Sequence, residues 1–123
     1  LHALLARSQR EQFSTIVEGV HVRPSIPKDF TLPPDAIVVP LLIAADRERT
    51  LKAFFRGRAI SAPRRGRKHY LDNIEAIWDL QTLLVSEAET NGVPIVVNEA
   101  EGGIMMTRMY SLISAAVLKA SPL

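Results

Sequence analysis

The sequence contains no cysteine, and its net charge is only +2 at pH 7. Without thiols the chain forms no disulfide and no thiolate metal site. Its longest apolar run, residues 36–45, is too short to cross a bilayer, and no signal peptide is recognisable. We therefore expect a soluble, cytoplasmic protein without a membrane partner. The small net charge gives no general attraction to nucleic acid.

What is present is the apolar content of one domain: 47% of the 123 residues are hydrophobic. No internal repeat or low-complexity segment divides the chain. It begins with Leu rather than Met, in a segment whose apolar spacing is typical of the end of a helix. We therefore expect residues 1–123 to form a single partial domain of a longer protein.

Three apolar segments predict buried strands, at residues 13–20, 36–45 and 93–98. Pro40 lies in the middle of the second segment, where a proline disturbs strand pairing, so we expect a distortion there. Four prolines between the first two segments predict a loop.

Helical periodicity separates these strands. It predicts a helix that Asp46 caps and that runs to about residue 58, a long helix over residues 70–91, and a final helix after Gly103. Between the first two lies a basic loop, "SAPRRGRK". Helices that alternate with buried strands are typical of an α/β fold with a parallel sheet.

Each predicted strand ends at a polar side chain: Glu18, Asp46 and Asn98. In an open parallel sheet, ligands bind beyond the carboxyl ends of the strands, so we expect these ends to cluster. An acid in the position of Glu18 either holds Mg²⁺ or is simply solvated. We interpret Asp46 as a helix cap. His21 either binds substrate phosphate or bonds to loop backbone, and Asn98 either contacts a nucleotide or merely ends a strand.

Positive charge is concentrated between Arg47 and Lys68, which holds nine of the fifteen Lys and Arg residues against one acid, Glu48. Guanidinium groups bind phosphate oxygens in pairs and keep their charge, so a lid that handles phosphate is one interpretation. The alternatives are a solvated surface and an RNA-binding patch. Only Tyr70 adjoins the segment as an aromatic, and the lack of interleaved stacking residues argues against nucleic acid.

Three segments together resemble the later part of 2-phosphoglycerate kinase and related P-loop kinases: "IVEGVHVRP", "VVPLLIAADRERTLKAFFRGRA" and "HYLDNIEAIWDLQTLLVSEAETNGVPIVVN". The resemblance covers residues 15–98. It implies ATP- and Mg²⁺-dependent phosphorylation of 2-phosphoglycerate, a small phosphorylated substrate, to 2,3-bisphosphoglycerate, and a three-layer P-loop sandwich with an arginine-rich lid at about residues 56–69. Trp78 departs from the family, where a basic residue is usual.

The resemblance also implies roles for individual residues, with Glu18 as both a catalytic and a metal-binding group. The implied catalytic arginines are Arg58, Arg64 and Arg65. The implied substrate-binding residues are His21, Arg56, Arg67 and Tyr70, and Asn98 is the implied nucleotide-binding residue.

One expected motif is absent, because no G-x-x-x-x-G-K-[ST] occurs in the 123 residues. That loop holds the phosphates of ATP, and its strand lies at the centre of the P-loop sheet. Without it we expect an incomplete sheet with an exposed apolar seam, an inactive fragment and self-association. The alternative is a degenerate P-loop domain that binds a phosphorylated metabolite or partner without catalysis; an RNA-associated module is a third hypothesis.

Overall fold

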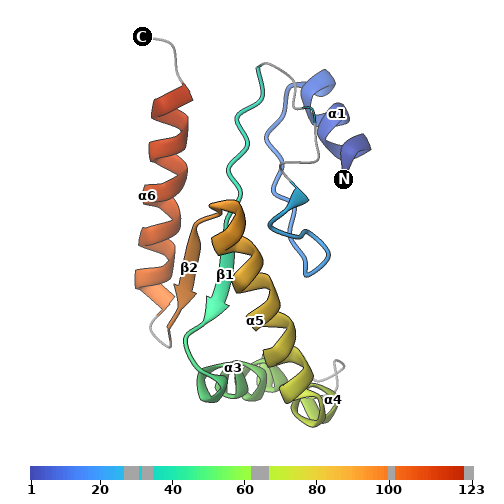
Figure 1. The fold of residues 1–123 in the computed structure, drawn as a ribbon, viewed down its shortest axis with the longest axis vertical. Coiled ribbons are helices and arrows are strands. Elements are labelled where there is room, and N and C mark those ends of the chain that lie inside the picture. Colours follow the sequence, from blue (N-terminus) through green and yellow to red (C-terminus); the bar gives the residue numbers. More distant parts are fainter. Residues whose placement is uncertain (27–30, 32–34, 62–66, 100–101, 121–123) are drawn as a thin grey trace.

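The computed structural model describes residues 1–26, 31, 35–61, 67–99 and 102–120 (Figure 1). Helices surround a small parallel sheet, which confirms the predicted α/β class. The elements in chain order are α1 (His2–Glu11), β1 (Leu42–Ala45), α3 (Glu48–Ser61), α4 (Arg67–Asp72), α5 (Ile74–Asn91), β2 (Ile95–Asn98) and α6 (Gly102–Ala120).

The two strands pair in parallel, with Leu42 opposite Ile95 and Ala45 opposite Asn98. The amide of Leu42 donates to the Pro94 carbonyl at 2.9 Å, which begins the ladder. The helices α3, α4 and α5 connect β1 to β2, as a parallel pair requires.

The core lies where α5 packs against both strands, while α6 packs against β2 (Figure 1). Its residues are almost fully shielded from solvent: Ala88 of α5 is 0% exposed and Val96 of β2 is 1% exposed. These branched and small side chains suit a sheet that a helix covers closely. Within the described residues, no helix combines the length and apolarity needed to span a membrane.

The predicted strand at residues 13–20 is wrong: the segment is irregular and ends in a turn, where the Val22 amide donates to the Gly19 carbonyl at 3.0 Å. Ile16 is 95% exposed. A strand is stable only when a neighbour takes up its backbone groups, and no described segment pairs with this one. Apolar character alone therefore does not make it a strand.

The predicted strand at residues 36–45 is partly right, because only Leu42–Ala45 enters the sheet. The expected distortion at Pro40 is confirmed: pairing begins two residues after it. A proline supplies no amide to a ladder, so the preceding apolar residues do not join the sheet, and Ile37 and Val38 remain 48% and 38% exposed.

The single helix predicted over residues 70–91 is two helices, α4 and α5, with Asn73 between them. The side-chain amide of Asn73 donates to the His69 carbonyl at 2.8 Å. Asparagine competes in this way with helical backbone bonds, which explains the break. The preceding helix, α3, continues to Ser61 rather than stopping near residue 58, and α4 begins at Arg67 within the predicted basic loop.

We expect Val96→Ala to lower the free energy of unfolding by about 2 kcal/mol, since it removes two buried methyl groups and leaves a cavity in the core. Urea denaturation monitored by circular dichroism measures the change. The matched control is Val20→Ala, whose side chain is 57% exposed and which we expect to cost little. Equal losses in the two variants would contradict this description of the core.

Candidate functional site

A pocket of about 320 Å³ lies at the carboxyl ends of β1 and β2. Strands and helices both contribute to its wall, since α3 follows β1 directly and α5 crosses over the sheet. The lining residues are Ile43, Ala44, Ala45, Leu51, Phe54, Phe55, Gln81 and Asn98. This is the position at which parallel α/β sheets bind ligands.

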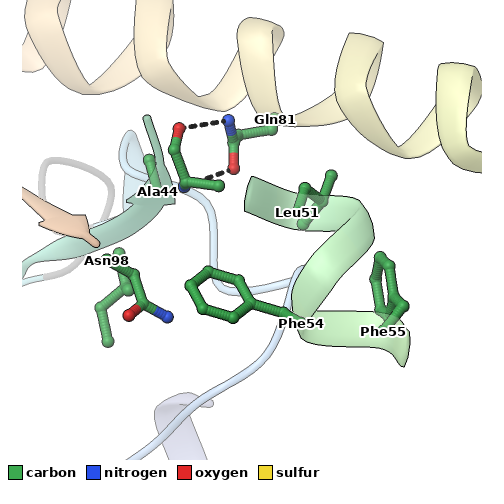
Figure 2. A pocket seen from close by; sticks show the side chains of 8 residues that line it. Ala44, Leu51, Phe54, Phe55, Gln81 and Asn98 are labelled. Atoms are coloured by element: carbon green, nitrogen blue, oxygen red, sulfur yellow. Dashed lines mark hydrogen bonds between the residues drawn. The ribbon is translucent and has the colours of Figure 1, made fainter. Parts of the chain in front are cut away.

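Gln81 fixes the end of β1 with both ends of its side-chain amide. The Ala45 amide donates to Gln81 Oε1 at 2.8 Å, and Gln81 Nε2 donates to the Ala45 carbonyl at 3.1 Å (Figure 2). Backbone groups alternate in direction along a parallel strand. Because those of Leu42 face β2, those of Ala45 face the opposite edge, and Gln81 occupies the place of a neighbouring strand there.

Asn98 and Phe54 point toward one another across the pocket (Figure 2). Asn98 is half-buried at the end of β2. None of the eight lining side chains is charged. The pocket therefore suits an uncharged, planar portion of a ligand, with the amide of Asn98 to orient it.

Asp46 stands beside this pocket at the beginning of α3. The Leu51 amide donates to the Arg47 carbonyl at 3.1 Å, so the first helical carbonyl belongs to Arg47 and the predicted cap precedes it by one residue. Hydrogen bonding from the Thr50 side chain, and then the Arg47 charge, lowers the pKa of Asp46. Arg47 Nε lies 3.1 Å from Asp46 Oδ2. The carboxylate therefore stays ionised at the helix N-terminus.

The predicted arginines fall only partly within the described structure. Arg56 is exposed on α3. The backbones of Arg58 and Arg67 lie in α3 and α4, but their side chains are outside the description, and Arg64 and Arg65 fall outside the described residues.

Tyr70 is half-buried and stacks on Phe55, with ring centroids 4.8 Å apart and planes inclined by 2°. The stack links α3 to α4, the helices on either side of residues 62–66. It holds together the two ends of the arginine-rich segment.

Glu18 and His21 are exposed in the turn after the irregular segment and do not line the pocket. Two of the three predicted strand ends thus meet, because Ala45 and Asn98 are register partners, and the third does not belong to a strand. Within the described residues, no group of three His, Asp or Glu side chains is arranged to hold a metal ion.

Sequence reasoning missed Glu87, a residue of α5 that binds the segment after His21. Arg23 donates to Glu87 Oε2 from Nε at 3.0 Å and from Nη2 at 2.7 Å, and the Ser25 amide donates to Oε1 at 3.0 Å. The hydrogen bond from Ser25, and to a lesser extent that from Arg23, lowers the pKa of Glu87. More than sixty residues separate the partners, so no local pattern in the sequence marks the contact.

The chain is similar to archaeal 2-phosphoglycerate kinases, which confirms the resemblance expected from the sequence. It is 31% identical to the 2-phosphoglycerate kinase of Thermococcus kodakarensis over 98 residues, 80% of this chain and 32% of that protein. It is 28% identical to that of Pyrococcus horikoshii over 98 residues, 80% of this chain and 31% of the relative. For the Methanopyrus kandleri enzyme, the identity is 29% over 119 residues, 97% of this chain and 36% of the relative.

The chain spans about a third of the length of these relatives. No protein-family model matches it. No solved structure gives a significant match either. The relationship therefore rests on the curated sequences.

Replacing Gln81 by Leu should destabilise the protein by about 1–3 kcal/mol, because the amide and carbonyl of Ala45 lose their partners in a partly buried position. Chemical denaturation measures this loss. Thr82→Ala is the control, since Thr82 is exposed on the same helix and bonds only within it. A Gln81→Leu variant as stable as the control would show that the amide does not secure β1.

Acid should destabilise the fold through Asp46 and Glu87. Both carboxyl groups have a folded-state pKa below the ordinary values of 3.8 and 4.5, so the unfolded chain binds more protons as the pH falls. Their stabilising contribution is present above those values and is lost as the pH falls through the folded-state pKa values, beginning below about pH 5.

Melting temperatures at pH 7 and pH 3 test this in the wild type and in Asp46→Asn/Glu87→Gln. We expect the wild type to lose more degrees on acidification than the double variant, in which neither side chain titrates. An equal fall in the two proteins would show that other carboxyl groups account for the acid sensitivity.

Proposed function

We propose that this chain is part of an ATP-dependent small-molecule kinase that phosphorylates 2-phosphoglycerate to 2,3-bisphosphoglycerate. The observation that carries the proposal is the similarity to three archaeal proteins of that name over 80% or more of the chain. The pocket at the carboxyl ends of two parallel strands supports it, because that is where such sheets bind ligands. A three-layer P-loop sandwich, with β1 and β2 as two of its strands, is part of the proposal.

In this proposal the uncharged pocket receives the nucleotide base, and Asn98 contacts it from the end of β2. The side chain points into the pocket and faces Phe54, which offers an aromatic surface (Figure 2). The nucleotide phosphates then lie outside the pocket, because none of its lining side chains carries a charge to hold them.

The arginine-rich segment is assigned the phosphates. Arg58, Arg64 and Arg65 would stabilise the transferring group, while Arg56, Arg67, His21 and Tyr70 would bind the phosphorylated acceptor. Guanidinium groups suit this task because phosphoryl transfer depends on positioning and on neutralising charge. The exposed positions of Arg56 and His21 leave both side chains accessible to a ligand.

Glu18 is assigned the role of a single carboxylate ligand to magnesium. Mg²⁺ usually binds proteins through one or two carboxylates and completes its shell with water and substrate phosphates. An exposed single carboxylate matches that requirement, whereas a cage made only of protein side chains does not occur in the described residues. When bound with ATP, Mg²⁺ would neutralise charge on the phosphates, and Glu18 would hold it through its carboxylate.

The alternative function is a degenerate P-loop domain that binds a phosphorylated metabolite or a partner chain without catalysis. The absence of G-x-x-x-x-G-K-[ST] from the 123 residues favours it. Reading the coding sequence upstream of Leu1 discriminates between the two: a glycine-rich loop that ends in Lys-Ser or Lys-Thr supports the kinase, and an upstream region without that loop supports the binder.

Calorimetry on the product of the complete gene tests the kinase directly. We expect binding of MgATP and of 2-phosphoglycerate, and transfer of the terminal phosphate to 2-phosphoglycerate. Binding of 2-phosphoglycerate without turnover would favour the degenerate domain, and binding of neither ligand would remove the kinase.

Glu18→Gln in that protein should reduce kcat by about a hundredfold, which corresponds to about 2.7 kcal/mol, and should weaken the magnesium dependence of nucleotide binding. The change keeps the shape of the side chain and removes its charge. The melting temperature without ligand should stay within about a degree, because Glu18 is exposed. Loss of folding with full activity in the folded fraction would instead make Glu18 a structural residue.

A further inference from the structure

Glu87 provides a long-range anchor for the segment that carries Glu18 and His21. Its two carboxylate oxygens accept three hydrogen bonds from Arg23 and from the Ser25 backbone. The Glu87 side chain is only 11% exposed, and Pro24, between its two partners, is buried. Removing one partner from a shielded ion pair costs more than removing it from an exposed surface pair, so this contact constrains the chain.

The turn itself is held mainly from its two ends. Its closing bond runs from the Val22 amide to the Gly19 carbonyl, and the Gly19 φ of 141° is open to glycine and strained for other residues. On the amino-terminal side, the hydroxyls of Ser8 and Thr15 hydrogen-bond and connect the segment to α1. On the other side the anchor is Glu87.

Chain length limits how far the two proposed site residues can move from that anchor. His21 lies two residues from Arg23 and Glu18 lies five, and an extended chain spans at most about 3.6 Å per residue. His21 therefore stays within about 7 Å of the Arg23 backbone, and Glu18 within about 18 Å. With both side chains exposed, core packing does not fix them further.

We propose that Glu87 is a positioning residue, which holds the Glu18–His21 turn against α5 so that its carboxylate and imidazole meet the phosphates in a fixed place. This inference rests on the proposed function, which assigns those two side chains to metal and substrate. Rate depends steeply on such placement, because small displacements of a reacting or binding group reduce turnover many-fold.

The test is a double-mutant cycle in the product of the complete gene. We expect Glu87→Gln to lower kcat/KM for 2-phosphoglycerate by about tenfold in the wild-type background. In the Glu18→Gln background the same change should lower kcat/KM by less than about twofold. The Glu18 side chain carries no charge in that variant, so displacement of the turn no longer moves a carboxylate away from the phosphates. Arg23→Gln, which removes the same ion pair from its exposed side, should reproduce both results.

Glu89→Gln is the matched control, since Glu89 is exposed on the same helix two residues away. We expect it to leave kcat/KM unchanged in both backgrounds. If Glu87→Gln costs the same factor with and without the Glu18 carboxylate, or costs nothing, the positioning role is wrong.

Amide hydrogen exchange supplies a readout that does not depend on activity. In Glu87→Gln and Arg23→Gln, the amides of Val22 and Ser25 should exchange faster, while those of α5 away from the contact keep their rates. Unchanged exchange at both amides would overturn the inference even in an active enzyme. A wild-type protein that shows the anchored turn but transfers no phosphate would instead overturn the proposed function, and with it the catalytic meaning of the anchor.

Discussion

The parallel pairing of β1 with β2 is the constraint on which the rest of the structure depends. Parallel strands need a long crossover, and here that crossover consists of α3, α4 and α5. Of these helices, α3 and α5 supply half of the residues that line the pocket. The pairing also buries Val96 and Ala44 and sets Ala45 opposite Asn98. Both the core and the candidate site thus depend on the pairing of Leu42–Ala45 with Ile95–Asn98.

Helix α3 lines part of the pocket and also precedes the arginine-rich segment of the sequence. The pocket is lined by apolar side chains and two amides, whereas α3 and α4 border a segment rich in arginine. The stacked rings of Phe55 and Tyr70 connect the two helices between which that segment runs.

The sequence predicted what depends on local pattern. The α/β class, the strand ending at Asn98 and the disturbance at Pro40 all follow from residue types and their spacing. The segment at residues 13–20 was predicted as a strand because its apolar residues are typical of one. A strand forms only where a second strand pairs with it, and the local sequence does not show whether such a strand is present. For the same reason the sequence did not predict the roles of Gln81 and Glu87. Each accepts a hydrogen bond from a residue distant in the chain, and the residues adjacent to it in sequence form no recognisable motif.

The amide of Gln81 also limits what can be added to the sheet. An unpaired strand edge invites another strand, including one from a second molecule. At the edge of β1 that faces away from β2, Gln81 already occupies the donor and the acceptor of Ala45, which leaves Ile43 as the other strand residue whose backbone groups face that way. A strand that pairs along this edge therefore cannot hydrogen-bond to Ala45 unless the two hydrogen bonds between Gln81 and Ala45 break first.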